Sequence, residues 1–324
     1  MFIPGNSHKM LSKMTTMHLP VDAYVPDLED SVPLGSAKDE ARTLVQQFIE
    51  QEWIPHFHKG GDASSSASSQ LIPLLIPRVN ATLGESVLYA DLKAMVTRGT
   101  DAITFGKAES AHSVQLVSRM LSQIEQEKNL PQNSIKVIPW IETALGIVNA
   151  YTICSADRDR LVGVAFGADD YANDLGIMRD TKGQNVEREL EYPRSVIAVA
   201  ASAARVLSLD TPNVNFRDAN STIEESRAVK QLGFKGKFAI HPNQVPHLND
   251  VFGISESEYA YAKKVVDAYE LAASADGGQR GSTQVDGRMI DTPVYRTYAQ
   301  MLARAEAMRA RDRATLSSFV GAEC

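Results

Sequence analysis

The chain is poor in cysteine and in long hydrophobic runs. Cys154 and Cys324 are the only cysteines among 324 residues, which excludes a disulfide framework and indicates a reducing compartment. No apolar run approaches the roughly 18 residues that a membrane span needs. Lysine and arginine (33) are outnumbered by aspartate and glutamate (40), and the resulting net charge of −7 argues against a general nucleic-acid surface. We therefore expect neither a membrane nor a nucleic acid as partner.

The first residues, Met1-Phe2-Ile3-Pro4-Gly5, show neither a signal-peptide core nor an arginine-rich presequence. Phe2-Ile3 is typical of the end of a strand whose start is missing, so we expect that a preceding segment has been trimmed. The expected localisation is the cytoplasm or the mitochondrial matrix.

Short apolar segments alternate with longer helical patterns along the first three quarters of the chain. The predicted strands are Phe2–Pro4, Ala23–Leu28, Leu74–Val79, Ala102–Phe105, Lys136–Glu142, Leu161–Gly167, Asn213–Phe216 and Lys237–Ile240. The predicted helices between them are Ser36–Glu50, Ser86–Thr97, Ser113–Glu127, Thr143–Ile153, Tyr192–Leu207 and Thr222–Leu232. Eight strands separated by helices predict an α/β fold, a (β/α)8 TIM barrel over residues 1–241.

Residues 242–324 follow a different pattern. Only helices are predicted there, over Gln244–Val251, Glu256–Ala273 and Pro293–Arg311, with a flexible joint at Asp276–Gly281. We expect a C-terminal helical extension that packs on or across the barrel mouth, its own or that of a neighbouring subunit. Within the barrel, the Gly/Ser-rich stretch Lys59–Ser69 predicts a mobile surface loop.

Two consecutive strands end in acids. Glu142 closes the apolar run Val137–Ile141, and Asp169 and Asp170 follow Leu161–Ala168. A carboxylate at the end of a buried strand is poorly solvated and needs a cation, hydrogen bonds or a proton. Hard oxygen donors suit Mg²⁺, which takes one or two carboxylates plus water and substrate oxygens. The sequence predicts a Mg²⁺ site; the alternatives are that Glu142 caps the next helix and that Asp170 pairs with an arginine.

Other candidate residues lie at the same strand ends. Arg78 closes an apolar run, where a planar guanidinium suits a carboxylate or enolate oxygen; the alternative is an ion pair with Asp27 or Glu29. Glu29, Asp30 and Lys107 are expected to hold Arg78 and the metal ligands in place. Asp169 is the rival ligand to Asp170.

Four further residues have plain structural explanations as well. Lys9 and Lys13 are four residues apart and share a helix face, as solvated lysines commonly do. His241, before a proline, is also typical of a loop histidine bonded to backbone. Asp291 precedes Thr-Pro at the start of a predicted helix, which is what a helix N-cap requires.

A series of motifs in order along the chain resembles the citrate lyase β-subunit-like family of the HpcH/HpaI aldolase superfamily, which includes malyl- and citramalyl-CoA lyases. The matching pieces are Pro4-Gly5-Asn6, Asp27-Leu28-Glu29-Asp30-Ser31-Val32, Lys38 with Arg42, Arg78-Val79-Asn80, Lys107-Ala108-Glu109-Ser110, Ile141-Glu142-Thr143-Ala144-Leu145-Gly146, Phe166-Gly167-Ala168-Asp169-Asp170-Tyr171, Gly236-Lys237, Ile240-His241-Pro242-Asn243-Gln244 and Gly287-Arg288-Met289-Ile290-Asp291.

The resemblance implies a homotrimeric, Mg²⁺-dependent TIM barrel that acts on a coenzyme A (CoA) thioester. It implies that Glu142 and Asp170 bind the metal, with Asp169 supporting them, that Arg78 binds substrate, and that Asp291, delivered by a neighbouring subunit, is the catalytic acid/base. It places Phe2, Lys9, Lys13, Ile240 and His241 at CoA-contact positions. The chain departs from the family at Phe105-Gly106, where a Leu-Pro pair is usual, at Asp169, which is often glutamate, and at Ser7, which is arginine in many bacterial members.

The expected function is cleavage or formation of a 3-hydroxy-3-carboxyacyl-CoA, such as malyl-CoA or citramalyl-CoA, to acetyl-CoA and glyoxylate or pyruvate, with malate synthase activity where hydrolysis follows. The alternatives are a metal-dependent aldolase on free 2-keto-3-deoxy acids, a citrate lyase β subunit in complex with an acyl carrier protein, and a silent paralogue, which the intact set of candidate residues argues against.

Overall fold

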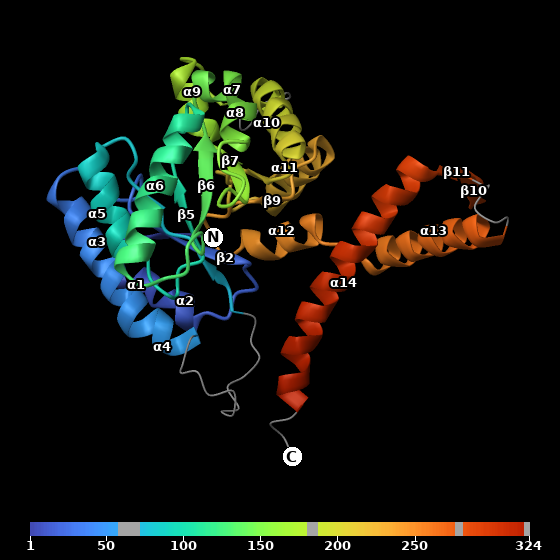
Figure 1. Cartoon of the computed structure of the whole chain (residues 1–324), viewed down its shortest axis with the longest axis horizontal. Coiled ribbons are helices and arrows are strands. Elements are labelled where there is room, and N and C mark those ends of the chain that lie inside the picture. The colour runs from blue at the N-terminus through green and yellow to red at the C-terminus, as the bar shows by residue number, and fades with distance from the viewer. Residues whose placement is uncertain (58–71, 180–186, 276–280, 321–324) are drawn as a thin grey trace. The chain divides into compact units, whose positions relative to one another are not determined.

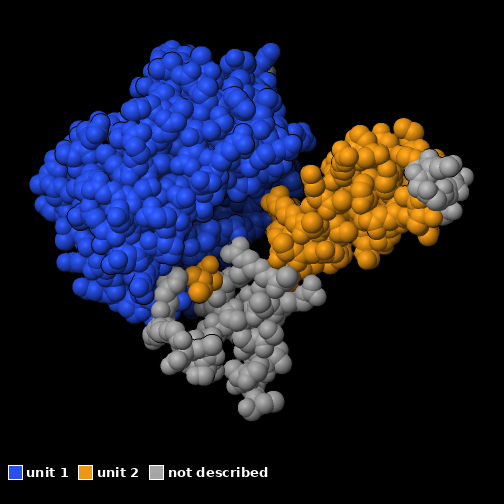
Figure 2. Space-filling view, in the orientation of Figure 1, with its two compact units in different colours: residues 1–60, 73–252 blue, residues 61–72, 253–324 orange. Residues whose placement is uncertain are grey.

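The computed structural model describes residues 1–57, 72–179, 187–275 and 281–320. The chain divides into two compact units, one of residues 1–60 and 73–252, the other of residues 61–72 and 253–324 (Figure 2). The predicted mobile loop at Lys59–Ser69 lies outside the described residues, and so does the predicted joint at Asp276–Gly281 apart from Gly281. Among the described residues, no helix is long and apolar enough to cross a membrane.

A sheet of parallel strands forms the centre of the first unit, and helices lie on its outside (Figure 1). The strands are β1 (Phe2–Pro4), β2 (Ala23–Asp27), β3 (Leu74–Leu75), β4 (Arg78–Val79), β5 (Ala102–Phe105), β6 (Lys136–Ile141), β7 (Gly163–Phe166), β8 (Leu207–Asp210) and β9 (Gly236–Lys237). Their order is β1-β2-β4-β5-β6-β7-β8-β9, with β3 also beside β2. The strands curl into a half-barrel, so the predicted α/β class with parallel strands is confirmed.

The helices predicted in this unit are present with different ends, and the structure adds further short helices that the apolar periodicity does not predict. In chain order the helices are α1 (His8–Leu11), α2 (Lys13–Thr16), α3 (Ser36–Phe48), η1 (Ile49–Trp53), α4 (Ile54–Phe57), α5 (Glu85–Met95), α6 (Ala111–Glu127), α7 (Ala144–Val148), α8 (Ala150–Cys154), α9 (Ala168–Asp174), η2 (Arg188–Leu190), α10 (Glu191–Ala204), α11 (Ala219–Leu232) and α12 (Gln244–Phe252). The helix predicted over Thr143–Ile153 is divided at Asn149 into α7 and α8.

Strand β6 shows why the sheet is buried on both faces. Val137 and Ile141 belong to the main core, together with helix residues of α6 and α8. Ile138 and Trp140 alternate with them and join a second apolar cluster, built mainly from the strands. Successive side chains of a strand point to opposite faces, so an unbroken apolar run with this alternation fits a strand packed on both sides.

The two ends of the strand series approach each other. The backbone N–H of Phe2 in β1 donates to the carbonyl of Ala239, two residues beyond β9, over 2.8 Å. The Phe2 ring stacks on Phe238 with centroids 5.3 Å apart. The first strand therefore neighbours the segment that follows the last.

The seventh predicted strand is wrong. Asn213–Phe216 lies in a loop, and the strand is β8 at Leu207–Asp210, where the prediction had a helix ending at Leu207. The cause is Arg205, which ends α10 in the left-handed conformation with φ of 64°. A helix usually ends this way at glycine, so the sequence contains no visible stop signal at this point.

The second unit contains α13 (Glu256–Ala275), α14 (Thr292–Val320) and a hairpin of β10 (Ser282–Val285) and β11 (Arg288–Asp291). The prediction that residues 242–324 form only helices is therefore wrong. A two-residue turn joins the strands, Asp286 at φ 49° and Gly287 at φ 79°, and an Asp-Gly turn of this kind favours tight hairpins. Val265, Val285 and Ile290 form the buried core of the unit.

Candidate functional site

Arg78 is held at the carboxyl ends of β2 and β4 by three acids. Its Nε and Nη2 donate to the two carboxylate oxygens of Asp27, both over 2.7 Å, and its Nη1 donates to Asp30 over 2.8 Å. Glu29 Oε2 lies 3.3 Å from Nη1. Burial opposes ionisation of Asp27, but the hydrogen bonds and charge of Arg78 outweigh it and hold the pKa of Asp27 below its ordinary value. The ion-pair alternative for Arg78 is thus present in the structure, and it fixes the orientation of the guanidinium.

Glu142 follows β6 and is 3% exposed. Its Oε1 accepts a hydrogen bond from the backbone N–H of Lys107 over 2.8 Å. Burial, with the charges of Asp170 and Glu29, raises the pKa of Glu142 to about 8. The capping alternative is wrong, because the side chain of Thr143 caps α7. Glu142 is a buried carboxyl group surrounded by other acids, and such a group is stabilised by a cation.

Glu29 is a third acid at the same place. It is 7% exposed, and its Oε2 has no hydrogen-bond partner in the part of the chain that the structure describes. Burial raises the pKa of Glu29 to about 7, although the nearby Arg78 opposes the rise. Glu29 therefore lies between the arginine and the acidic end of β6.

Two glycines make the space for these carboxylates. A Cβ atom on Gly106 would lie 2.6 Å from Oε1 of Glu142 and 2.9 Å from Oε1 of Glu29. A Cβ atom on Gly167 would lie 2.0 Å from Oε2 of Glu142. The ends of β5 and β7 therefore lack side chains where the carboxylates lie. Gly106, one of the departures from the family pattern, is required here by the packing.

Lys107 interacts with Asp170 and also with Glu142 and Glu29, the acids that follow β6 and β2. Nζ of Lys107 lies 3.2 Å from Oδ1 of Asp170. Burial works against the charge of Lys107, but Asp170 and the other acids raise its pKa overall. Asp169, although adjacent, is exposed and pairs with Arg179 over 3.0 Å. The arginine partner that the alternative assigned to Asp170 therefore belongs to Asp169.

The donor set fits a small divalent cation. No group of three or more His, Cys, Asp or Glu side chains with metal-ligand geometry occurs among the described residues. Mg²⁺ does not require one, since it is commonly held by one or two carboxylates plus water and substrate oxygens. Glu142 and Asp170 are close enough for the charge of one to raise the pKa of the other, and Asp169 points to a separate partner. The structure thus brings the predicted pair together and directs the side chain of Asp169 to a different partner.

The predicted CoA-contact residues near the N-terminus differ in exposure. Phe2 lies under the guanidinium of Arg78, whose carbon is 4.8 Å from the ring centroid. Lys9 is exposed and Lys13 is half-buried. They lie on two short helices, α1 and α2, that meet at Ser12. The single helix face expected for the two lysines is therefore interrupted.

The other predicted CoA-contact residues follow β9. Ile240 is 44% exposed. His241 Nδ1 accepts a hydrogen bond from the backbone N–H of Asn243. This confirms the prediction of a loop histidine that is bonded to the backbone. The imidazole also stacks on Phe216, with centroids 4.9 Å apart.

Asp291 belongs to the second unit, where it ends β11. Its Oδ1 accepts a hydrogen bond from the backbone N–H of Val294 over 3.1 Å, so Asp291 caps α14 as the sequence pattern predicts. The cap fixes the orientation of the carboxyl group at the positive end of a helix dipole.

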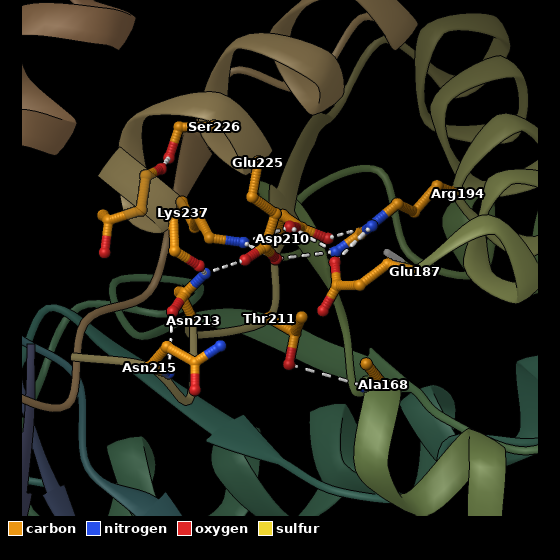
Figure 3. Close-up of polar contacts among 12 residues, drawn as sticks. Ala168, Glu187, Arg194, Asp210, Thr211, Asn213, Asn215, Glu225, Ser226 and Lys237 are labelled. Carbon is orange, nitrogen blue, oxygen red and sulfur yellow. Dashed lines mark hydrogen bonds and ion pairs between the residues drawn. The ribbon is translucent and has the colours of Figure 1, made fainter. Parts of the chain in front are cut away.

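A buried set of charges near β7, β8 and β9 was not predicted. This charge network consists of Arg179, Glu187, Arg194, Asp210, Glu225 and Lys237. Arg194 and Lys237 approach Asp210 and Glu225 from two sides (Figure 3). Burial opposes ionisation of Glu187, but Arg194 and Arg179 hold its pKa below the ordinary value. The six charges come from separate segments of the chain, so no single sequence motif indicates the network.

A pocket of about 1060 Å³ lies beside the charge network, lined in part by Glu187, Arg194, Asn215, Phe216 and Glu225. It is distinct from the acids around Glu142, none of which lines it. Its walls carry both acidic and basic side chains, and among them Arg194 is paired with Glu187 and with Glu225.

A family model described as HpcH/HpaI aldolase/citrate lyase matches residues 1–242. The chain belongs to this family. Citrate lyase subunit beta of Leuconostoc mesenteroides subsp. cremoris is 33% identical over 307 residues, which cover 95% of this chain and 92% of that protein. Mitochondrial citramalyl-CoA lyase of Rattus norvegicus is 25% identical over 316 residues, 95% and 86% of the two chains. CitE of Mycobacterium tuberculosis, solved in complex with magnesium, acetoacetate and coenzyme A, has a TM-score of 0.67 and 27% identity, over 94% of this chain and 96% of that one.

These findings confirm the predicted family. The citrate lyase and citramalyl-CoA lyase relatives are carbon–carbon lyases, which confirms the predicted enzyme class. The coenzyme A and magnesium in the CitE structure belong to that protein and bear on the proposal below.

Proposed function

We propose that the chain is a Mg²⁺-dependent carbon–carbon lyase that cleaves or forms a 3-hydroxy-3-carboxyacyl-CoA such as malyl-CoA or citramalyl-CoA. The products of cleavage are acetyl-CoA and glyoxylate or pyruvate, and a hydrolytic step on the condensation product gives malate synthase activity. The observation that carries the proposal is that Glu142, which follows β6, and Asp170, in the first turn of α9 after β7, converge beside Arg78. A citramalyl-CoA lyase relative and the CoA-bound CitE structure support the substrate class.

The predicted site residues of the first unit each have a role in this chemistry. Glu142 and Asp170 hold Mg²⁺, which when bound supplies Lewis-acid polarisation of the keto or hydroxyl oxygen of the substrate. Arg78 binds the substrate carboxylate and stabilises developing negative charge. Asp27, Glu29 and Asp30 fix Arg78, as their 2.7–3.3 Å contacts with the guanidinium indicate. Lys107 offsets the charge of Asp170, and Asp169 supports the helix that carries it.

Asp291 exchanges the proton at carbon 2 of the acyl group, the carbon that becomes the methyl group of acetyl-CoA. In this proposal the catalytic domain comprises residues 1–241, and the extension at residues 242–324 brings Asp291 to the site of a neighbouring subunit in a homotrimer. The helix cap supports the role because it fixes one carboxyl oxygen. CoA binds along Phe2, Lys9, Lys13, Ile240 and His241, where the exposed lysine charge suits phosphate groups.

The proposal extends to the closure of the sheet. A closed (β/α)8 barrel requires that the first and last strands pair. The hydrogen bond from Phe2 N–H to the Ala239 carbonyl supports this closure. The strand ends that carry Glu142, Asp170 and Arg78 then form one rim, where (β/α)8 enzymes have their active sites.

The test is a cleavage assay of the purified chain on malyl-, methylmalyl- and citramalyl-CoA, with Mg²⁺ and with EDTA, alongside the Asp291→Ala variant. We expect turnover of at least one thioester, loss of that turnover in EDTA with recovery on excess Mg²⁺, and at least a roughly 100-fold slower Asp291→Ala enzyme. A rate that EDTA does not change would remove the metal assignment. Activity on free 2-keto-3-deoxy acids alone would replace the proposal with the aldolase alternative.

A second candidate is a citrate lyase β subunit that acts on a thioester of an acyl carrier protein. The 33% identity to citrate lyase subunit beta, against 25% to citramalyl-CoA lyase, favours it. Gel filtration with the same assay separates the two. A pure chain that cleaves CoA thioesters by itself supports the first, and a chain that is active only on a carrier-protein thioester supports the second.

A further inference from the structure

The hairpin that ends at Asp291 has a fixed register. Ser282 pairs with Asp291, Thr283 with Ile290, Gln284 with Met289 and Val285 with Arg288. The turn at Asp286 and Gly287 has positive φ at both positions, which is the geometry that locks a two-residue hairpin. The face on which each side chain lies therefore follows from its position.

The two faces of the hairpin differ in their environment. Val285 and Ile290, on one face, are 4% and 2% exposed in the core of the second unit. Asp291 and Met289 share the other face, because residues two apart on a strand point the same way. Met289 is 69% exposed. Packing in the core of the second unit therefore explains why Val285 and Ile290 are apolar, but it does not explain why the exposed residue 289 is a methionine.

Met289 is close to the proposed acid/base. Two residues along a strand span roughly 7 Å, so wherever Asp291 meets its substrate, the Met289 side chain lies within reach of the same group. The residues across the hairpin from this pair are Ser282 and Gln284, which are polar and exposed. Met289 is thus the large apolar side chain on this face, and a thioether is flexible enough to pack against a small alkyl group.

We propose that Met289 determines specificity for the substituent on carbon 2 of the acyl thioester. The inference rests on the proposed function, in which Asp291 exchanges a proton with that carbon. A hydrogen at carbon 2 leaves room for Met289, whereas a methyl group there meets the thioether. A methyl group on carbon 3, the keto-acid side of the breaking bond, lies away from it.

Three thioesters separate these positions. Malyl-CoA has no methyl branch, methylmalyl-CoA has one on carbon 2, and citramalyl-CoA has one on carbon 3. For Met289→Ala we expect the ratio of kcat/KM for methylmalyl-CoA to that for malyl-CoA to rise at least about fivefold, within the range that a single methylene can discriminate. The ratio for citramalyl-CoA to malyl-CoA should stay within about twofold.

Two matched variants control the experiment. Met289→Leu keeps the bulk and should preserve both ratios. Arg288→Ala truncates an exposed neighbour on the opposite face and should also leave both ratios unchanged. Because Met289 is exposed, its truncation should not alter the melting temperature, which circular dichroism checks.

The outcomes are distinct. A methylmalyl-to-malyl ratio that falls or stays within twofold in Met289→Ala overturns the inference while the proposed function stands. An unchanged ratio with an altered gel-filtration volume assigns Met289 to a subunit contact and overturns it as well. A wild-type chain that cleaves none of the three thioesters overturns the proposed function, and the inference with it.

Discussion

Replacement of Gly167 by alanine is the sharpest test of the metal site. The new Cβ atom would lie 2.0 Å from Oε2 of Glu142, at least 1.0 Å closer than the 3.0 Å below which real Cβ contacts essentially never occur. Alanine can adopt the backbone angles of Gly167, φ −107° and ψ 100°. The new Cβ atom would also lie 2.6 Å from the Cβ atom of Glu142, so the whole Glu142 side chain must move relative to Gly167. A displacement of about 1 Å in an active site commonly costs about 100-fold in rate.

For Gly167→Ala we therefore expect kcat/KM to fall about 100-fold and Mg²⁺ affinity to weaken by at least about tenfold. Steady-state kinetics and calorimetric titration of Mg²⁺ measure the two effects. Gly281→Ala is the matched control, because a Cβ atom there meets nothing within 4 Å. A Gly167→Ala enzyme with wild-type Mg²⁺ affinity and rate would show that Glu142 does not hold the ion, and the reasoning from steric exclusion would fail.

Two further predictions concern buried ion pairs. Arg78→Lys keeps the charge but loses the two-pronged contact with Asp27, so kcat/KM should fall at least about 100-fold, and an unchanged rate would remove the substrate-binding role. Glu125 accepts two hydrogen bonds from Arg160. Burial opposes the ionisation of Glu125, but Arg160 lowers its pKa overall. The pair therefore stabilises the fold fully at pH values above the ordinary pKa of glutamate, and this stabilisation is lost as the pH falls through the lowered pKa. Glu125→Gln should therefore cost about 3–5 kcal/mol in urea unfolding at neutral pH and less near pH ~4, and a cost that is the same at both pH values would contradict this account.

The sequence predicts best where one segment carries its own signal. The apolar run before Glu142 predicts a buried strand with an acid at its end, and that is where β6 ends. The Asp-Leu-Glu-Asp motif likewise places Asp27, Glu29 and Asp30 together, and the structure gathers all three around Arg78.

Prediction fails where the cause lies between segments. Gly106 follows one predicted strand and Gly167 ends another, and the sequence around each does not reveal that its function is to leave room for a carboxylate from a different segment. The strand β8 was hidden because a non-glycine residue, Arg205, ends the preceding helix in the left-handed region. The hairpin near Asp291 was missed because its strands have only four residues each, and such short runs carry little periodicity.

The charge network has a consequence for how this family member can change. Its three acids and three bases balance, and most of them are almost fully buried. Loss of any one leaves an uncompensated charge within a buried network, which is more costly than loss of a complementary pair. Sequence drift at these six positions is therefore expected to proceed by paired exchange, and close relatives should retain the whole set or replace an acid and its base together.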